Sequence, residues 1–133
     1  MDSKTIVDMR LFEEYDPKYS NYLWIGQSDQ FQPKLPAVED CSIDDAIVID
    51  ICNFKGIITG SNQRSVLIAV YRFLRELGAA WVHPGEEGEN IPKRVLDDCH
   101  VDICEKPSSR HRVICIEGAV AYEHIRNMID WLP

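Results

Sequence analysis

Residues 46–78 read AIVIDICNFKGIITGSNQRSVLIAVYRFLRELG, and this stretch predicts two strands followed by a helix. Residues 46–51 are mostly β-branched and apolar on both faces, a pattern typical of a strand that is buried on both sides. Residues 55–60 predict a second strand that ends in glycine. The two strands are expected to form a hairpin across residues 52–54.

The helix is predicted over residues 63–77 by its apolar periodicity. Apolar residues recur at spacings of three and four, at Val66, Ala69, Val70, Phe73, Leu74 and Leu77. Ser61 and Asn62 are both good N-cap residues, and Gly78 stands where a left-handed C-cap belongs. We expect the apolar stripe to lie on the sheet that the two preceding strands form.

Weaker patterns extend the prediction to both sides of this stretch. Short strands are expected at residues 5–9, 22–25, 79–83, 101–104 and 113–116, and a second helix at residues 121–132. Residues 27–41 contain two prolines and no helical period, so we expect an irregular connection there and no helix in residues 10–45. The residues alone predict one α/β domain.

Length and composition limit the classes of function. The chain has 133 residues, which suits one domain, and a net charge of −8, which disfavours binding to nucleic acid or to an anionic membrane surface. Charged residues near the N-terminus occupy positions where a signal peptide needs an apolar core. The five cysteines include no C-x-x-C pair, which favours a reducing compartment, so we expect a cytoplasmic protein.

One group of residues raises the question of a metal site. Cys99, His100, Cys104 and His111 lie within thirteen residues, but their spacing matches no common zinc pattern. The alternative is that Cys104 and Cys115 are small buried apolar groups in strands, and we favour it. No metal is therefore expected.

Two further motifs have both a functional and a structural interpretation. Glu86, Glu87 and Glu89 could bind a cation, but they lack the spacing of a calcium loop, so a solvated acidic turn is favoured. Gly60 precedes a helix start, as in some phosphate sites, yet no G-x-G-x-x-G motif is present. We expect a tight strand-to-helix turn at Gly60 and no nucleotide or other cofactor.

Arg64 lies in the first turn of the predicted helix, where a cation is unfavourable against the helix dipole. We therefore expect it to pair with an acidic group of a neighbouring element, and we favour a structural role over one directed at a substrate. No local pattern predicts a nucleophile with its base or a pair of catalytic carboxylates. We name no catalytic residue.

Residues 60–85, with the sequence GSNQRSVLIAVYRFLRELGAAWVHPG, carry a resemblance to a known family. This stretch resembles the N-terminal domain of bacterial α-glucuronidases and their relatives, in which a helix ends Y-x-F-L-x-x-L-G before an aromatic residue and Pro-Gly. The same fold precedes the catalytic barrel in family-20 β-N-acetylhexosaminidases. Residues 112–131, RVICIEGAVAYEHIRNMIDW, resemble the first strand and helix of that barrel. In all, the resemblance covers roughly residues 42–133.

This resemblance implies an α+β fold, in which a mixed β-sheet carries helices packed mainly on one face. Residues 1–108 are then an accessory domain, and residues 109–133 are the start of a truncated (β/α)₈ barrel. Arg112 and Glu117 occupy the places of an arginine and an aspartate of the hexosaminidase strand, whereas Val120 departs from a sugar-binding arginine. Arg112 and Glu117 are thus candidate carbohydrate contacts, in the full-length chain only.

The resemblance implies a non-catalytic domain that braces the catalytic barrel of a glycoside hydrolase, whose substrate is a carbohydrate. The alternative is a stand-alone carbohydrate-binding or protein-interaction module, and a weaker option is a small enzyme using Cys99, His100 or His83. Trp24 and Trp81 lie in apolar patterns and are expected in the core. Trp131 is expected to be exposed where the barrel is absent, which predicts self-association through the C-terminal helix.

Overall fold

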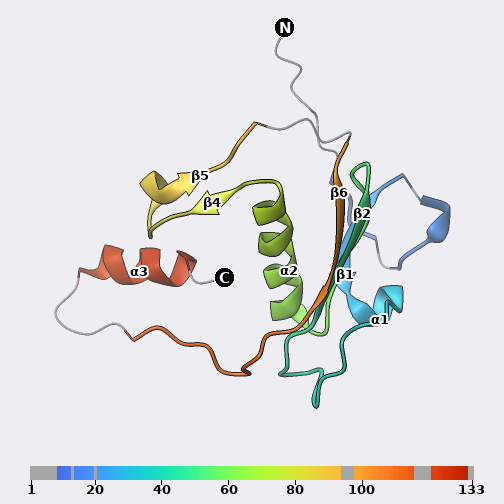
Figure 1. Ribbon diagram of the computed structural model, residues 1–133, viewed down its shortest axis with the longest axis horizontal. Helices are drawn as coiled ribbons and strands as arrows, with labels where there is room; N and C mark the ends of the chain where they lie inside the picture. The colour runs from blue at the N-terminus through green and yellow to red at the C-terminus, as the bar shows by residue number, and fades with distance from the viewer. Residues whose placement is uncertain (1–8, 13, 20, 94–97, 116–120, 132–133) are drawn as a thin grey trace, which may run out of the picture.

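The computed structural model describes residues 9–12, 14–19, 21–93, 98–115 and 121–131 (Figure 1). A four-stranded mixed sheet forms one side of the molecule, and helix α2 (Gln63–Glu76) lies against one of its faces. A smaller layer made of β4 (Ala80–Trp81), β5 (Glu89–Asn90) and α3 (Tyr122–Trp131) lies on the other side of α2 (Figure 1). The predicted α+β class is confirmed.

The sheet has the order β1-β3-β2-β6, with β1 (Leu23–Gln27) parallel to β3 (Lys55–Gly60). β2 (Ile47–Cys52) is antiparallel to both β3 and β6 (His100–Glu105). Asn53 and Phe54 have φ of 52° and 59°, so a two-residue turn with two left-handed residues closes the β2–β3 hairpin. The predicted hairpin and the strands predicted at 22–25 and 101–104 are confirmed.

Helix α2 begins and ends as its sequence predicts. The Asn62 side chain accepts a hydrogen bond from the Ser65 N–H at 3.0 Å, and Gly78 has a φ of 91° just after the helix. Gly60 makes the turn from β3 into α2. A Cβ atom there would lie 2.5 Å from the Ser65 Cβ, so only glycine permits this close approach.

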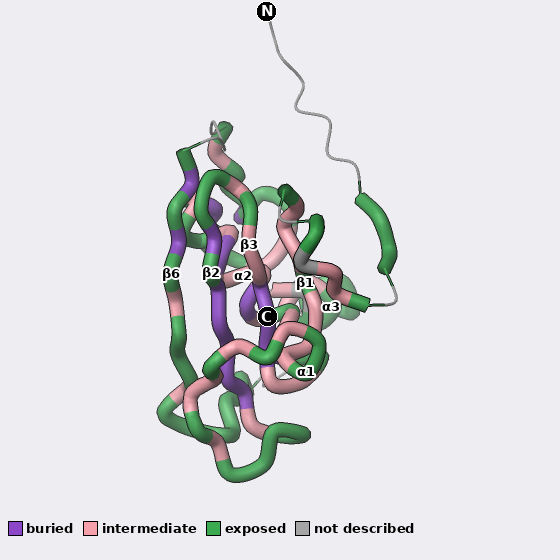
Figure 2. The backbone as a smooth tube through the Cα atoms, turned by 90° about the vertical axis from the view of Figure 1, so that its right-hand side faces the viewer, coloured by how far each residue is buried: buried purple, intermediate pink, exposed green. Residues whose placement is uncertain are grey.

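The hydrophobic core lies between α2 and the sheet face that it covers. Its buried members come mainly from the two central strands and the inner side of the helix, and are Ile47, Ile49, Ile51, Ile58, Ala69, Phe73, Cys99 and Val101. Figure 2 shows this burial along β2 and the end of β3, with β6 and β1 at the edges of the sheet. The predicted packing of the helix on the hairpin is confirmed.

Aromatic residues connect α2 to the smaller layer. The Trp81 ring lies 5.0 Å from the Tyr71 ring on the outer side of α2, measured between centroids. Trp131 Nε1 donates a hydrogen bond to the carbonyl oxygen of Trp81 at 2.9 Å, which holds the end of α3 on β4. Trp24, Trp81 and Trp131 are all half-buried, so the expectation that Trp131 is exposed is wrong, and Trp24 and Trp81 are only partly buried instead of lying in the core.

The N-terminal part contains short helical turns that the sequence analysis did not predict. A single 3₁₀ turn, η1, spans Pro17–Tyr19, and the four-residue α1 spans Ser28–Phe31, where an irregular connection was expected. One helical turn needs no apolar period. The Phe31 ring packs 5.1 Å from the Tyr15 ring, and Gln32 ends the turn with a φ of 51°.

The strand predicted at residues 113–116 is wrong at its described positions, because residues 113–115 form no strand. An extended segment pairs only where a neighbouring strand offers hydrogen-bonding partners. Residue 116 and most of the strand predicted at residues 5–9 lie outside the described residues; Met9 itself is not in a strand. In the part of the chain that the structure describes, no helix is long and apolar enough to cross a membrane.

Replacing Phe73 with alanine tests this account of the core. Phe73 is buried against the sheet, so Phe73→Ala is expected to lower the free energy of unfolding by about 3–5 kcal/mol. Leu67 lies on the same helix but is 49% exposed, and Leu67→Ala is the matched control, with an expected loss below about 1 kcal/mol. Urea denaturation measures both, and equal losses would contradict the assignment of the core.

Candidate functional site

A buried carboxylate, Asp45, lies immediately before β2 and joins three separate parts of the chain. It is only 4% exposed. Its carboxylate accepts hydrogen bonds from Arg64 Nε at 3.0 Å, from Ser65 Oγ at 2.8 Å and from the Arg112 guanidinium. Two cations and a hydroxyl therefore compensate for the loss of water around the charge.

The loop that carries Asp45 is held by its own turn and by the start of α2. Asp40 Oδ1 accepts hydrogen bonds from the backbone N–H and the hydroxyl of Ser42, at 2.9 and 2.6 Å. The carbonyl oxygen of Asp44 accepts from Ser61 Oγ at 2.6 Å and from Asn62 Nδ2 at 3.1 Å. The residues that begin α2 thus also fix the loop.

A second ion pair, next in sequence, reaches the same C-terminal segment. The Asp44 carboxylate accepts hydrogen bonds from Arg110 Nε and, at 2.9 Å, from Arg110 Nη2, which is a bidentate arrangement. The Arg110 guanidinium lowers the pKa of Asp44 to about 2, with help from the backbone N–H of Asp40. Conversely, Asp44 raises the pKa of Arg110. We call Asp44, Asp45, Arg64, Ser65, Arg110 and Arg112 the Asp44–Asp45 clamp.

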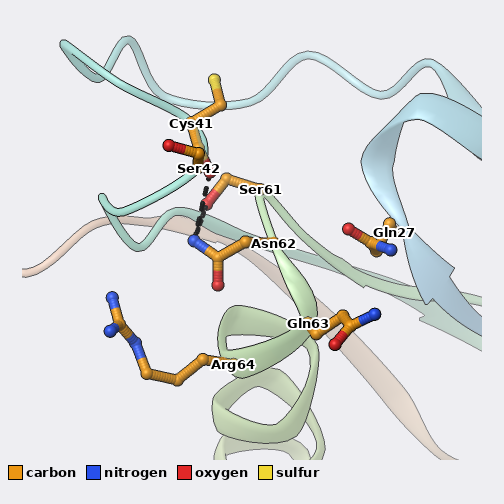
Figure 3. A pocket seen from close by; sticks show the side chains of 7 residues that line it. All are labelled: Gln27, Cys41, Ser42, Ser61, Asn62, Gln63 and Arg64. Atoms are coloured by element: carbon orange, nitrogen blue, oxygen red, sulfur yellow. Dashed lines mark hydrogen bonds between the residues drawn. The ribbon is translucent and has the colours of Figure 1, made fainter.

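Two open hollows border the clamp. One, of about 470 Å³, lies at the start of α2 (Figure 3) and is lined by Gln27, Cys41, Ser42, Ser61, Asn62, Gln63 and Arg64. The other, of about 480 Å³, is lined by Val38, Glu39, Asp44, Asp45, Lys106, Pro107, Ser108, Arg110 and His111. Of the clamp residues, Arg64 lines the first hollow, whereas Asp44, Asp45 and Arg110 line the second.

The candidate metal ligands are not brought together. Cys99 is part of the core beneath α2, whereas its neighbour His100 is exposed on β6, and His111 is exposed in the C-terminal segment. Cys104 and Cys115 are exposed, so the expectation that they are buried is wrong; the buried cysteine is Cys99. Across the described residues, no three His, Cys, Asp or Glu side chains are arranged to hold a metal ion.

The other candidates have clear positions. Glu86, Glu87 and Glu89 are exposed around the 3₁₀ turn η2 (Glu86–Gly88) and the short β5, as expected of a solvated acidic turn. The predicted acidic partner of Arg64 is Asp45. Arg112 binds the same carboxylate, and Glu117 lies outside the described residues.

Sequence reasoning missed Asp44 and Asp45. The available signal was a pair of adjacent carboxylates directly before a strand buried on both sides, where a charge needs a partner. Arg110 and Arg112 stand two positions apart, so an extended segment carries both on one side. These two pairs are separated by 66 and 67 positions, and no local pattern connects them.

Comparison with known proteins does not assign the chain to a family. No protein-family model, curated protein or solved structure matches it. The resemblance to glycoside hydrolase accessory domains therefore stays a prediction.

Neutralising Asp45 tests the clamp. Asp45→Asn keeps the shape of the side chain but removes the charge that binds two arginines, and we expect a loss of about 1–3 kcal/mol in the free energy of unfolding. Asp50→Asn is the matched control, because Asp50 is exposed on β2 and lies directly opposite Asp102 of β6. Removing one of two facing like charges should be neutral or slightly stabilising. Urea denaturation at neutral pH measures the free energy of unfolding of both variants, and equal losses would contradict the clamp.

The pKa of Asp44 predicts how acid weakens the fold. Because the folded-state pKa is about 2, below the ordinary value of 3.8, the Asp44 charge stabilises the fold above pH about 4. That contribution is lost as the pH falls from about 4 to about 2. The measurement compares the free energies of unfolding of the wild type and Asp44→Asn over this range. We expect their difference to shrink with acidification, and a difference independent of pH would contradict the assignment.

Proposed function

We propose that this chain is the non-catalytic accessory domain of a glycoside hydrolase, and that it braces the catalytic unit following it. The observation that carries the proposal is the Asp44–Asp45 clamp. Arg110 and Arg112 come directly after the proposed domain boundary at residue 108, and their ion pairs tie the chain there to the sheet and to α2. A domain that braces a neighbour needs such a fixed exit for its chain.

The geometry of the exit supports this proposal. Asp44 and Asp45 are adjacent, and each binds one of two arginines two positions apart, so the segment is held at two successive points. Two points of attachment fix both the position and the direction of the segment. Since Asp45 is also bonded to α2, the exit is fixed relative to the central helix.

The stretch that carries the family resemblance also has structural tasks. Gly60 allows the close turn into α2, Gly78 ends the helix, and Trp81 packs on Tyr71. These roles are structural, and they suit a domain that supports a catalytic unit in another part of the protein. In this proposal Arg112 is a positioning residue. Glu117 remains a proposed carbohydrate contact of the full-length chain, and unchanged kinetics of a Glu117→Ala variant of that chain would remove it.

A second candidate function is a protein-interaction module. The observation that favours it is the outward apolar side of α3, where Tyr122 and Ile129 are exposed. Such a side marks a surface that another folded unit covers. A carbohydrate-binding module is less favoured, because the three tryptophans are half-buried in packing contacts.

The mass of the native polypeptide separates these candidates. An antibody raised against the 133-residue chain would be used on an extract of the source cells. We expect a band several times larger than 15.3 kDa, and the long chain is then assayed for hydrolysis of aryl glycosides. A band near 15.3 kDa, or a long chain without glycosidase activity, would overturn the hydrolase proposal and leave the interaction module.

A further inference from the structure

The two parallel strands of the sheet end side by side, and the chain leaves them toward opposite faces. Gln27 at the end of β1 lies opposite Gly60 at the end of β3. After β3 the chain enters α2, which packs on the face that carries the hydrophobic core. After β1 it enters α1, and Figure 1 shows α1 and α2 with the sheet between them.

The contacts of Gly26 confirm that α1 covers the face opposite α2. Gly26 pairs with Thr59, and the preceding residue, Ile58, belongs to the core under α2. Because side chains alternate along a strand, Thr59 and Gly26 face away from α2. A Cβ atom built on Gly26 would lie 3.0 Å from the Phe31 ring of α1. The ends of β1 and β3 therefore form a topological switch point, and ligands of open sheets bind in the crevice outside such a point.

A hollow of about 470 Å³ lies at this switch point, and we call it the switch-point hollow (Figure 3). Its volume is within the range of roughly 300–1,000 Å³ that is usual for small-molecule sites. The described residues that line it include no carboxylate, although the net charge of the chain is −8. A negatively charged ligand therefore meets no carboxylate in the lining.

Arg64 offers this hollow a donor and a positive charge. Its Nε and Nη2 donate to Asp45 and to the Ile43 carbonyl oxygen, at 3.0 and 2.7 Å, and its Nη1 bonds to no described residue. The Arg64 side chain is 57% exposed, and it shares the single charge of Asp45 with Arg112. An oxyanion beside Arg64 would accept from Nη1 and supply further negative charge.

Two glutamines supply further donors. The side-chain amides of Gln27 and Gln63 make no hydrogen bond to a described residue, whereas Ser61 and Asn62 are bonded within the protein. Figure 3 shows Gln63 and Arg64 pointing in opposite directions from the start of α2, with Gln27 on the side of Gln63. A ligand that reaches all three side chains must extend across the turn into the helix.

We propose that the switch-point hollow binds a small hydroxylated acid, in which a carboxylate or a phosphate group is joined to a short polyol. Arg64 binds the oxyanion, and the amides of Gln27 and Gln63 bind the hydroxyl groups, since an amide both donates and accepts hydrogen bonds. This inference goes beyond the hydrolase proposal and does not depend on it.

NMR titration of the ¹⁵N-labelled 133-residue chain at neutral pH and constant ionic strength tests the proposal. The probes are glycerate and glycerol 3-phosphate, which share two hydroxyl groups and differ in the oxyanion. We expect saturable shifts of the Arg64 Nε signal and of the Gln27 and Gln63 side-chain amides, with a dissociation constant on the order of 1 mM. The tighter probe identifies the preferred oxyanion. Glycerol, which has no oxyanion, should bind at least about tenfold more weakly.

The side-chain amides of Gln30 and Gln32 are internal controls, because neither residue lines the hollow. Gln63→Glu places a negative charge in the lining and should weaken binding of both probes about tenfold. The variant should fold normally, since a carboxylate is favourable in the first turn of a helix. Arg75→Gln is the matched control: it lowers the net charge equally at the other end of α2, and it should change the affinity less than about twofold.

Three results would overturn the proposal. They are the absence of saturable shifts with both acids, shifts of equal size at the internal-control amides, and equal weakening of binding by Gln63→Glu and Arg75→Gln. Glycerol binding as tightly as the two acids would remove the role of Arg64 and overturn it as well. None of these results bears on the hydrolase proposal, which concerns the native mass and activity of a longer chain.

Discussion

The buried charge of Asp45 is the constraint on which the arrangement of the chain depends. A carboxylate removed from water is tolerated only with partners, and here the partners are Arg64 and Ser65 at the start of α2 and Arg112 in the C-terminal segment. The loop before β2, the first turn of α2 and the segment after β6 must therefore come together. Breaking one of these contacts leaves the charge in the interior with less compensation.

Arg64 shows how one such contact resolves a local conflict. A cation in the first turn of a helix is opposed by the helix dipole, and α2 has no acidic residue there to offset it. The carboxylate of Asp45 supplies the missing negative charge from outside the helix. Helix α2 is the central element, with the sheet on its inner side and Trp81 against Tyr71 on its outer side.

The elements that could be predicted are those whose signals are local. The hairpin and α2 follow from β-branched runs, a cap at Asn62 and a glycine at 78, all within 33 consecutive residues. The α1 turn was missed because four residues are too few to show a helical period. The strand expected at 113–116 was wrong at its described positions, because a run of apolar residues does not reveal whether a neighbouring strand is available for pairing. Of the clamp residues, the sequence analysis singled out only Arg64 and Arg112. The bonds of Asp44 with Arg110 and of Asp45 with Arg112 join residues 66 and 67 positions apart, so no local pattern reveals them.

The hydrogen bonds of the Asp44 and Asp45 carboxylates are relevant to the question of whether the clamp is an active site or a structural contact. A catalytic acid or base must leave at least one functional atom directed at a substrate. In Asp45, by contrast, Oδ1 is bonded to Arg64 and Ser65 and Oδ2 to Arg112. In Asp44 both oxygens are bonded to Arg110. These carboxylates hold protein against protein, and an arrangement in which opposite charges satisfy one another at a chain exit suits a supporting domain better than an active site.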